Sequence, residues 1–246
     1  MPDERNLMLA ALLARLADDC RHVVVGANSP IPACAALLAE AKAPDRFLVT
    51  ILGSQKYMQF TEGGRELFDY AAQGRMDAFF LGGGQIDGQA NVNLVGIGDY
   101  PNSKLRLPGS YGSAFMAFMV KKVILFREEH SPRVLVPKVD FISAPGSPPD
   151  GIFTRGQGPS DLVTGMCHMI FDREKKRFRL ASIHPGHTLD EVIAQTGFDF
   201  DHDDTAPQTP GPTDEERGLL TGPVREALAG VYPRFVAKTF AQTAAA

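Results

Sequence analysis

Short apolar segments and amphipathic segments alternate over the first third of the chain. Helical spacing of apolar residues predicts helices over 6–16, 32–42 and 64–72. Apolar runs, two of them closed by a glycine and the third leading into three glycines, predict strands over 22–26, 47–52 and 78–81. Continuous apolar strands that alternate with helices are typical of a parallel sheet covered on both faces. Such sheets bind their ligands beyond the carboxyl ends of the strands.

The pattern changes in the middle of the chain, where little helix separates the expected strands. These strands cover residues 123–126, 139–143, 165–171 and 177–183, and one helix is expected over 114–120. Residues 144–161 are rich in Pro and Gly and predict a long loop, which is a lid, an arm toward another subunit or a disordered segment. We therefore expect an α/β fold: a mostly parallel open sheet flanked by helices, with a β-rich insertion.

The last part of the chain is predicted to be a solvated linker followed by a helix. Residues 201–213 are rich in Asp, Thr and Pro, which favours a linker. Thr213 followed three residues later by Glu216 is typical of a helix start, and we expect a helix over 214–232. Residues 1–246 are expected to form a single domain, with 213–246 as a C-terminal helical tail.

Composition narrows the function classes. The chain has 246 residues, 44% of them hydrophobic, and a formal charge of -4. Its Lys and Arg residues are scattered, so we expect no nucleic-acid partner. No apolar stretch approaches the roughly 20 residues that span a bilayer, and two acidic residues precede the first apolar run, so we expect neither membrane insertion nor a secretory signal. Three cysteines without metal-ligand spacing favour a cytoplasmic protein.

The densest group of candidate functional residues is Leu81–Asn93, with the sequence LGGGQIDGQANVN. Three glycines directly after a buried strand allow backbone N–H groups to approach an oxyanion or a phosphate closely. The spacing departs from G-x-G-x-x-G, and a Walker lysine is missing, which argues against a nucleotide loop. The alternative is a tight turn whose side-chain amides cap the backbone.

A second glycine cluster, Leu107–Ser113, precedes the helix expected over 114–120. Backbone amides at a helix start stabilise an anion or a thioester carbonyl, which is what acyl transfer requires. Gly109 and Gly112 are equally consistent with plain turn residues.

Five short motifs together resemble the β subunit of family I CoA transferases of the glutaconate CoA-transferase type. They occur in the family's order and at similar spacing, and weaker similarity at residues 43–45 and 196–199 extends the resemblance over most of the chain. The motifs are Gly83-Gly84-Gln85-Ile86-Asp87, Asn91-Val92-Asn93, Ile97-Gly98-Asp99-Tyr100, Pro108-Gly109-Ser110 and the stretch from Lys138 to Gly146. The resemblance implies the CoA-transferase or NagB-like fold and an α-subunit partner.

The resemblance also implies a catalytic glutamate, and this chain lacks a glutamate at the corresponding position. In the family, a β-subunit glutamate attacks an acyl-CoA thioester, and its position falls at or near Ile51 here. Isoleucine has no nucleophilic oxygen. Glu62 is the nearest substitute, with an exposed loop residue as the plainer interpretation. A smaller departure is Ala90, where the family usually has glycine. Relatives without the β-subunit glutamate exist, and those that resemble this chain are hydrolases that open a ring of a β-keto acyl-CoA, with the working glutamate on the α subunit.

We therefore expect a β subunit of a CoA-transferase-like heteromer, a heterodimer or an α2β2 assembly, that acts on CoA esters and has no tightly bound cofactor. The residues expected to bind the thioester or its oxyanion are Gly83, Gly84, Gln85, Asp87, Asn91, Gly109 and Gly112. Three alternatives stay open: CoA transfer through another carboxylate, acyl-CoA hydrolysis or ring opening, and a non-catalytic structural subunit. The acyl group and the acceptor also stay open.

Two further groups of polar residues have plainer interpretations. His184 and His187 lie three residues apart beside a proline and a glycine. A metal requires further ligands, and Cys167 and His168 would join only if the fold brought them close, so no metal is expected. Residues 173–177 are all charged and predict a hairpin turn, with contact to CoA phosphates as the alternative.

Overall fold

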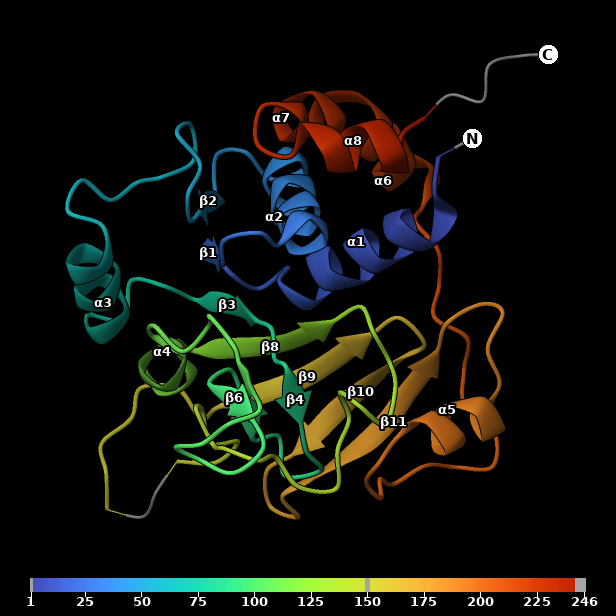
Figure 1. Cartoon of the computed structure of the whole chain (residues 1–246). Helices are drawn as coiled ribbons and strands as arrows, with labels where there is room; N and C mark the ends of the chain where they lie inside the picture. Colours follow the sequence, from blue (N-terminus) through green and yellow to red (C-terminus); the bar gives the residue numbers. More distant parts are fainter. Residues whose placement is uncertain (1, 149–150, 242–246) are drawn as a thin grey trace. The chain divides into compact units, whose positions relative to one another are not determined.

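The computed structural model describes residues 2–148 and 151–241 (Figure 1). Internal contacts divide the chain into two compact units. Unit 1 consists of Met1–Thr61 and Pro210–Ala246, and unit 2 consists of Glu62–Thr209. Unit 1 therefore joins the two ends of the sequence, while the expectation of a single domain over residues 1–246 stays a prediction.

Unit 1 contains two parallel strands and two helices from the start of the chain. Strands β1 (His22–Val25) and β2 (Leu48–Ile51) pair in register. Helices α1 (Glu4–Leu16) and α2 (Pro30–Lys42) pack against each other and bury their apolar residues. The structure confirms these four elements within two residues of the predicted bounds, because their apolar periodicity is strong.

The C-terminal helices return to α2 in unit 1. They are α6 (Asp214–Leu219), the π-helical turn η1 (Leu220–Val224), α7 (Arg225–Ala229) and α8 (Pro233–Thr239). The single helix predicted over 214–232 is wrong, since the π-helical turn interrupts it. Pro223 lies within this turn and lacks the N–H that a regular α-helix requires. Helix α8 lies beyond the helix predicted over 214–232 but within the expected helical tail, 213–246.

A buried ion pair ties the C-terminal helices to α1. Glu216 is 3% exposed, and its carboxylate accepts hydrogen bonds from Arg15 Nε at 3.1 Å and Arg15 Nη2 at 2.5 Å. Thr213 and Glu216 form the predicted capping box, which confirms the expected start of α6. Burial by itself would raise the pKa of Glu216, but the hydrogen bonds from Arg15 and the Thr213 N–H outweigh burial and lower it.

The sheet of unit 2 has the strand order β11-β10-β9-β8-β3. Strands β3, β8 and β9 are parallel neighbours, and β10 and β11 continue the sheet in antiparallel pairing. The five strands are β3 (Ala78–Leu81), β8 (Lys122–Arg127), β9 (Pro159–Thr164), β10 (Cys167–Asp172) and β11 (Arg177–Ile183). Together with the β1–β2 pair, this confirms a mostly parallel open sheet flanked by helices.

Shorter elements complete unit 2. Helices α3 (Gly64–Ala72) and α4 (Ser113–Met119) pack against each other. The segment between β3 and α4 forms two small hairpins, β4 (Gln85–Ile86) with β5 (Val92–Asn93) and β6 (Gly96–Ile97) with β7 (Leu105–Arg106). Helix α5 (Leu189–Gln195) has a capping box of Thr188 and Glu191 that the sequence interpretation overlooked.

Three predicted elements of unit 2 are wrong in whole or in part. Residues 139–143 are not a strand, because their polar groups bond to the β4–β5 hairpin and its flank instead. The loop expected over 144–161 ends earlier, since β9 begins at Pro159 between β8 and β10. The linker expected over 201–213 is not freely solvated, because Asp201 and Gln208 form bridges to β11. No described helix is long and apolar enough to cross a membrane.

The Arg15–Glu216 pair predicts a pH-dependent stability. We expect Glu216→Gln to lower the free energy of unfolding at pH 7 by about 1–3 kcal/mol, because the half-buried Arg15 guanidinium loses its charged partner. A carboxylate with a lowered pKa stabilises the fold above its ordinary pKa of 4.5, so the difference between variant and wild type should shrink as the pH falls below 4.5. Urea unfolding at several pH values measures this.

Glu4→Gln is the matched control, because Glu4 also pairs with an arginine through two hydrogen bonds but is 61% exposed. An exposed pair contributes ~0–1 kcal/mol. If the two variants lost equal amounts of the free energy of unfolding, burial of Glu216 would not be the reason that its ion pair stabilises the fold.

Candidate functional site

The glycine segment, Gly82–Gly84, directly follows the buried strand β3 in unit 2. Its close packing requires glycine at two positions. A Cβ at Gly83 would lie 2.9 Å from Val92 Cγ1, and one at Gly84 would lie 2.4 Å from Leu107 Cδ1. The N–H of Gly84 donates to Asn93 O at 2.9 Å. Among the residues that the structure describes, no acceptor is found for the N–H of Gly82 or Gly83.

The turn of the next hairpin is built around the carboxylate of Asp87, which is 4% exposed. Its Oδ1 accepts hydrogen bonds from the N–H groups of Gln89 at 3.0 Å and Asn91 at 3.1 Å. Its Oδ2 accepts from Asn91 Nδ2 at 3.1 Å and Val139 N at 3.4 Å. Both carboxylate oxygens are therefore occupied within the chain, and Asp87 fixes the turn between β4 and β5.

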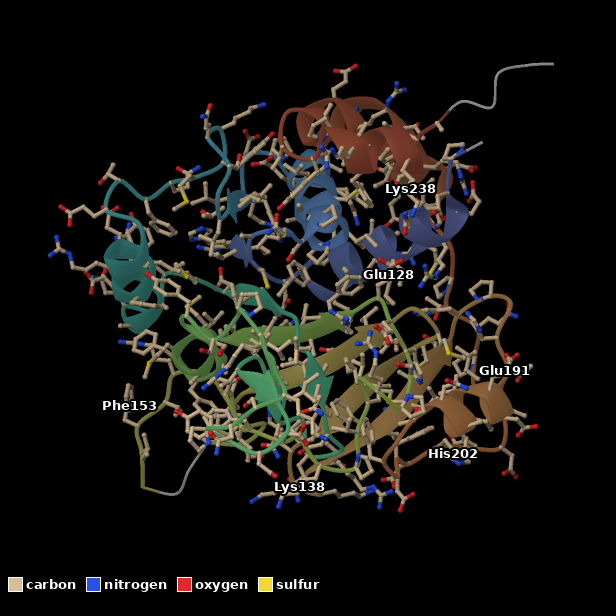
Figure 2. The ribbon with its side chains drawn as sticks, in the orientation of Figure 1. Glu128, Lys138, Phe153, Glu191, His202 and Lys238 are labelled. Atoms are coloured by element: carbon tan, nitrogen blue, oxygen red, sulfur yellow. The ribbon has the colours of Figure 1, made fainter. Side chains whose placement is uncertain are left out.

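Gln85 joins this hairpin to the loop that follows Lys138, whose exposed side chain is labelled in Figure 2. Gln85 Oε1 accepts from Asn93 Nδ2 at 2.7 Å and from Asp140 N at 3.0 Å. Its Nε2 donates to Asp140 Oδ2 at 3.2 Å, and the same oxygen accepts from Gly98 N at 2.7 Å. We call Gln85, Asn93 and Asp140 the amide hub.

Asn91 extends the hydrogen bonding to the start of the long loop. Its Oδ1 accepts from Gly146 N at 3.0 Å. Ser143 donates from Oγ to Val92 O at 2.8 Å and accepts from Leu94 N at 3.0 Å. The segment Gln85–Asn93 and the stretch from Lys138 to Gly146 therefore form one hydrogen-bonded structure beside the glycine segment.

The second glycine cluster lies against the first. Leu107 packs on Gly84, and Gly109 N donates to Leu94 O at 3.2 Å. Gly112 is the N-cap residue of α4, and a Cβ there would lie 2.5 Å from Phe68 Cε1 on α3. The structure thus brings Gly83, Gly84, Gln85, Asp87, Asn91 and Gly109 into one region of unit 2, while Gly112 lies at the contact between α3 and α4.

Ile51 is the last residue of β2 in unit 1 and is fully buried. Its N–H donates to Tyr57 O at 3.0 Å, and the turn after it contains Gly53 with a φ of +85°. The side chains of residues 52–61 include no carboxylate. Glu62 lies in unit 2, where its exposed carboxylate pairs with Arg65. Neither residue provides a buried, fixed nucleophile in its own surroundings.

The sequence analysis did not predict a buried Cys–His pair, which is formed by Cys167, the first residue of β10, and His130. Cys167 Sγ is 3.8 Å from His130 Nδ1, and both ring nitrogens of His130 bond to hydroxyls, of Thr164 at 2.8 Å and Thr196 at 2.9 Å. Burial lowers the pKa of His130 to about 4 and raises the pKa of Cys167 to about 12. Both side chains are therefore neutral at pH 7, which makes the pair a packing feature rather than an activated thiolate.

The other polar residues singled out in the sequence have structural roles. His184 is bonded to Thr209 Oγ1 at 2.8 Å and to Thr164 O at 3.0 Å. The described ranges contain no group of three His, Cys, Asp or Glu residues placed to hold a metal ion. Residues 173–176 form the predicted turn between β10 and β11, which confirms the charged hairpin.

The sequence model of the Coenzyme A transferase family matches residues 6–195. This match covers most of the chain, which therefore belongs to the Coenzyme A transferase family. The chain is 35% identical over 161 residues to the B subunit of 3-oxoadipate CoA-transferase from Pseudomonas knackmussii, covering 63% of this chain and 62% of that protein. It is 34% identical to the B subunit of glutaconate CoA-transferase from Acidaminococcus fermentans, covering 56% and 53%. The alignments thus span about half to three fifths of these relatives' length.

A third relative is the cholesterol ring-cleaving hydrolase IpdB subunit of Rhodococcus jostii, 29% identical with 63% of this chain and 62% of that protein covered. Among solved structures, Rhodococcus jostii RHA1 IpdAB has a TM-score of 0.78 at 24% identity, covering 89% of this chain and 93% of that chain. Glutaconate coenzyme A-transferase from Acidaminococcus fermentans has a TM-score of 0.75 at 24% identity, with the same coverage. The decarboxylase AibA/AibB also has a TM-score of 0.75. These structures share the fold of this chain.

Backbone and side-chain groups of the site region differ in how they are hydrogen-bonded. The polar atoms of Gln85, Asp87 and Asn91 are bonded within unit 2, whereas the Gly82 and Gly83 N–H groups have no acceptor among the described residues. Asn93 and Asp140 complete the hydrogen bonding but were not among the predicted site residues. Both occur in the motifs that indicated the family, and that was the available signal.

Asp87 provides a stability test. We expect Asp87→Asn to lower the free energy of unfolding by about 1–3 kcal/mol, because the new amide NH2 would face donors that now bond to a carboxylate. Asp99→Asn is the matched control in the same region, because Asp99 is exposed. Its expected change lies within ~0.5 kcal/mol. Denaturant unfolding measures both, and an unchanged stability of Asp87→Asn would show that the carboxylate does not brace the turn.

Proposed function

We propose that this chain is the β subunit of a CoA-transferase-like heteromer that acts on an acyl-CoA thioester and transfers CoA between carboxylic acids. The observation that carries the proposal is the glycine segment of a Coenzyme A transferase family member, held rigidly after β3 with two N–H groups that lack an acceptor within the described chain. Fixed N–H groups of this kind stabilise the negative charge that develops on a thioester oxygen.

Within this proposal, the seven site residues divide into two roles. Gly83 and Gly84 line the thioester, with Gly109 and Gly112 nearby. Gln85, Asp87 and Asn91 shape the site by holding the backbone, as their internal hydrogen bonds favour. Preorganised dipoles act without reorganisation during the reaction, so a rigid backbone is the useful contribution of this chain.

A partner α subunit completes the enzyme in this proposal, in a heterodimer or an α2β2 assembly. The names of similar structures contain two components, as in IpdAB and AibA/AibB, which supports a two-subunit assembly here. CoA esters are the substrates, without a tightly bound cofactor. We place the protein in the cytoplasm, which agrees with the three buried free thiols at Cys20, Cys34 and Cys167.

A second candidate function is hydrolysis or ring opening of a CoA ester, with the working carboxylate on the α subunit. The observation that favours it is Ile51, which is fully buried where the family resemblance implies the glutamate. The similarity to the ring-cleaving hydrolase IpdB subunit supports it further. In both candidates, this chain contributes electrostatic stabilisation and the partner supplies the acid, base or nucleophile.

The two reactions are distinguished by their products. The chain is co-purified with its α-type partner and incubated with acyl-CoA esters, with and without a free carboxylic acid. New CoA ester that depends on the acid supports CoA transfer, and free thiol or an opened product without the acid supports hydrolysis. A complex that consumes no CoA ester under either condition would contradict both functions and favour the remaining alternative, a structural subunit.

Gly82→Ala tests the backbone role with little effect on folding. A Cβ at Gly82 would meet its nearest atom, Phe126 O, at 3.5 Å, which is an ordinary contact. We expect the turnover of the complex to fall by about tenfold or more, because the methyl group keeps the thioester away from the backbone N–H groups. Gly218→Ala, on α6 with open space around it, is the control. Wild-type turnover in Gly82→Ala would remove the glycine segment from the site.

A further inference from the structure

Asp140 differs from the other members of the amide hub in its exposure. Gln85 is 6% exposed and Asn93 is fully buried, whereas Asp140 is exposed. Even so, one oxygen of Asp140 accepts two hydrogen bonds, from Gly98 N at 2.7 Å and from Gln85 Nε2 at 3.2 Å. Asp140 therefore connects solvent-facing backbone to a buried carboxamide.

The orientation of the Gln85 carboxamide depends on Asp140. An amide has an acceptor end and a donor end, and a buried amide requires partners for both. Gln85 Oε1 faces the Asn93 Nδ2 donor at 2.7 Å, so a reversed amide would place two donors against each other. The Asp140 oxygen, an acceptor for Gln85 Nε2, and the Asp140 N–H, a donor to Gln85 Oε1, both favour the observed orientation.

The same chain of contacts reaches the glycine segment. Asn93 Nδ2 also donates to Gly96 O at 2.7 Å, and Asn93 Oδ1 accepts from Val95 N at 3.0 Å, so the side chain is fixed from both ends. The main-chain oxygen of Asn93 accepts from Gly84 N at 2.9 Å. A shift of Gln85 is therefore passed through Asn93 to Gly84 and its neighbour Gly83.

We propose that Asp140 is a positioning residue: its carboxylate oxygen orients the Gln85 amide and, through Asn93, holds the backbone of Gly83 and Gly84 in the geometry that stabilises the reacting thioester. The inference rests on the proposed function and adds a residue to it. Asp140 acts as a hydrogen-bond acceptor in this role and exchanges no proton with the substrate. Misplacement of a catalytic group reduces turnover more than binding, because the group is required most in the transition state.

The test compares Asp140→Ala and Asp140→Asn in the complex with the α-type partner, with an acyl-CoA ester as the substrate. Asparagine keeps an oxygen that accepts from both Gln85 Nε2 and Gly98 N, whereas alanine removes it. We expect Asp140→Ala to lower kcat by about 10- to 100-fold with KM changed by less than about threefold. Asp140→Asn should recover most of that loss. Asp99→Ala, an exposed carboxylate next to Gly98, is the control for surface charge.

Thermal unfolding of each variant separates positioning from a structural role. The melting temperature of Asp140→Ala should fall only slightly, because water reaches this exposed position and replaces the lost acceptor. A decrease large enough to unfold the variant at the assay temperature would overturn the positioning role. A kcat of Asp140→Asn as low as that of Asp140→Ala would also overturn it, since the charge would then be required. An active complex that tolerates Asp140→Ala contradicts this inference alone, whereas a wild-type complex inactive on every CoA ester contradicts the proposed function as well.

Discussion

The internal hydrogen bonding of Gln85, Asp87 and Asn91 is the constraint on which the site region depends. Backbone hydrogen bonds such as Val92 N to Ala144 O at 2.9 Å join the β4–β5 hairpin to the loop at 138–146, and these buried side chains add further connections. A buried amide or carboxylate without a partner is costly, and this cost fixes a single arrangement of the loops. The glycine segment after β3 inherits its rigidity from that arrangement.

Local patterns were sufficient to predict the elements of the chain that pack in a regular way. The bounds of α3 and β3 agree with the prediction, and the capping box at Thr213 marks the start of α6. The failures in unit 2 share one cause, which is pairing with distant segments, whereas the helix predicted over 214–232 failed at the local π-helical turn that contains Pro223. Strand β9 is recognisable only through its neighbours β8 and β10, and residues 139–143 are apolar enough to suggest a strand but bond to the β4–β5 hairpin instead.

The location of the site could be predicted better than the role of its side chains. The sequence Leu81–Asn93 indicated a dense polar turn after a strand, and the structure confirms the interpretation in which side chains cap that turn. Side-chain amides cap the structure, and a role of the backbone N–H groups in binding a ligand stays a proposal. The spacing of 55 residues between Gln85 and Asp140 hides their contact from any local pattern. The isoleucine at position 51 indicates that the nucleophilic glutamate of the family is missing there, but the residue type does not show which group takes over its role.

We propose that this chain stabilises an acyl-CoA thioester without forming a covalent bond to it. The most direct measurement is the intact mass of each subunit during turnover of a CoA ester by the complex, after reduction that traps any enzyme-bound thioester. We expect this chain to keep its unmodified mass of 26.6 kDa while the ester is consumed. A CoA-dependent mass change on this chain during turnover would contradict it, since a nucleophile would then lie on this chain.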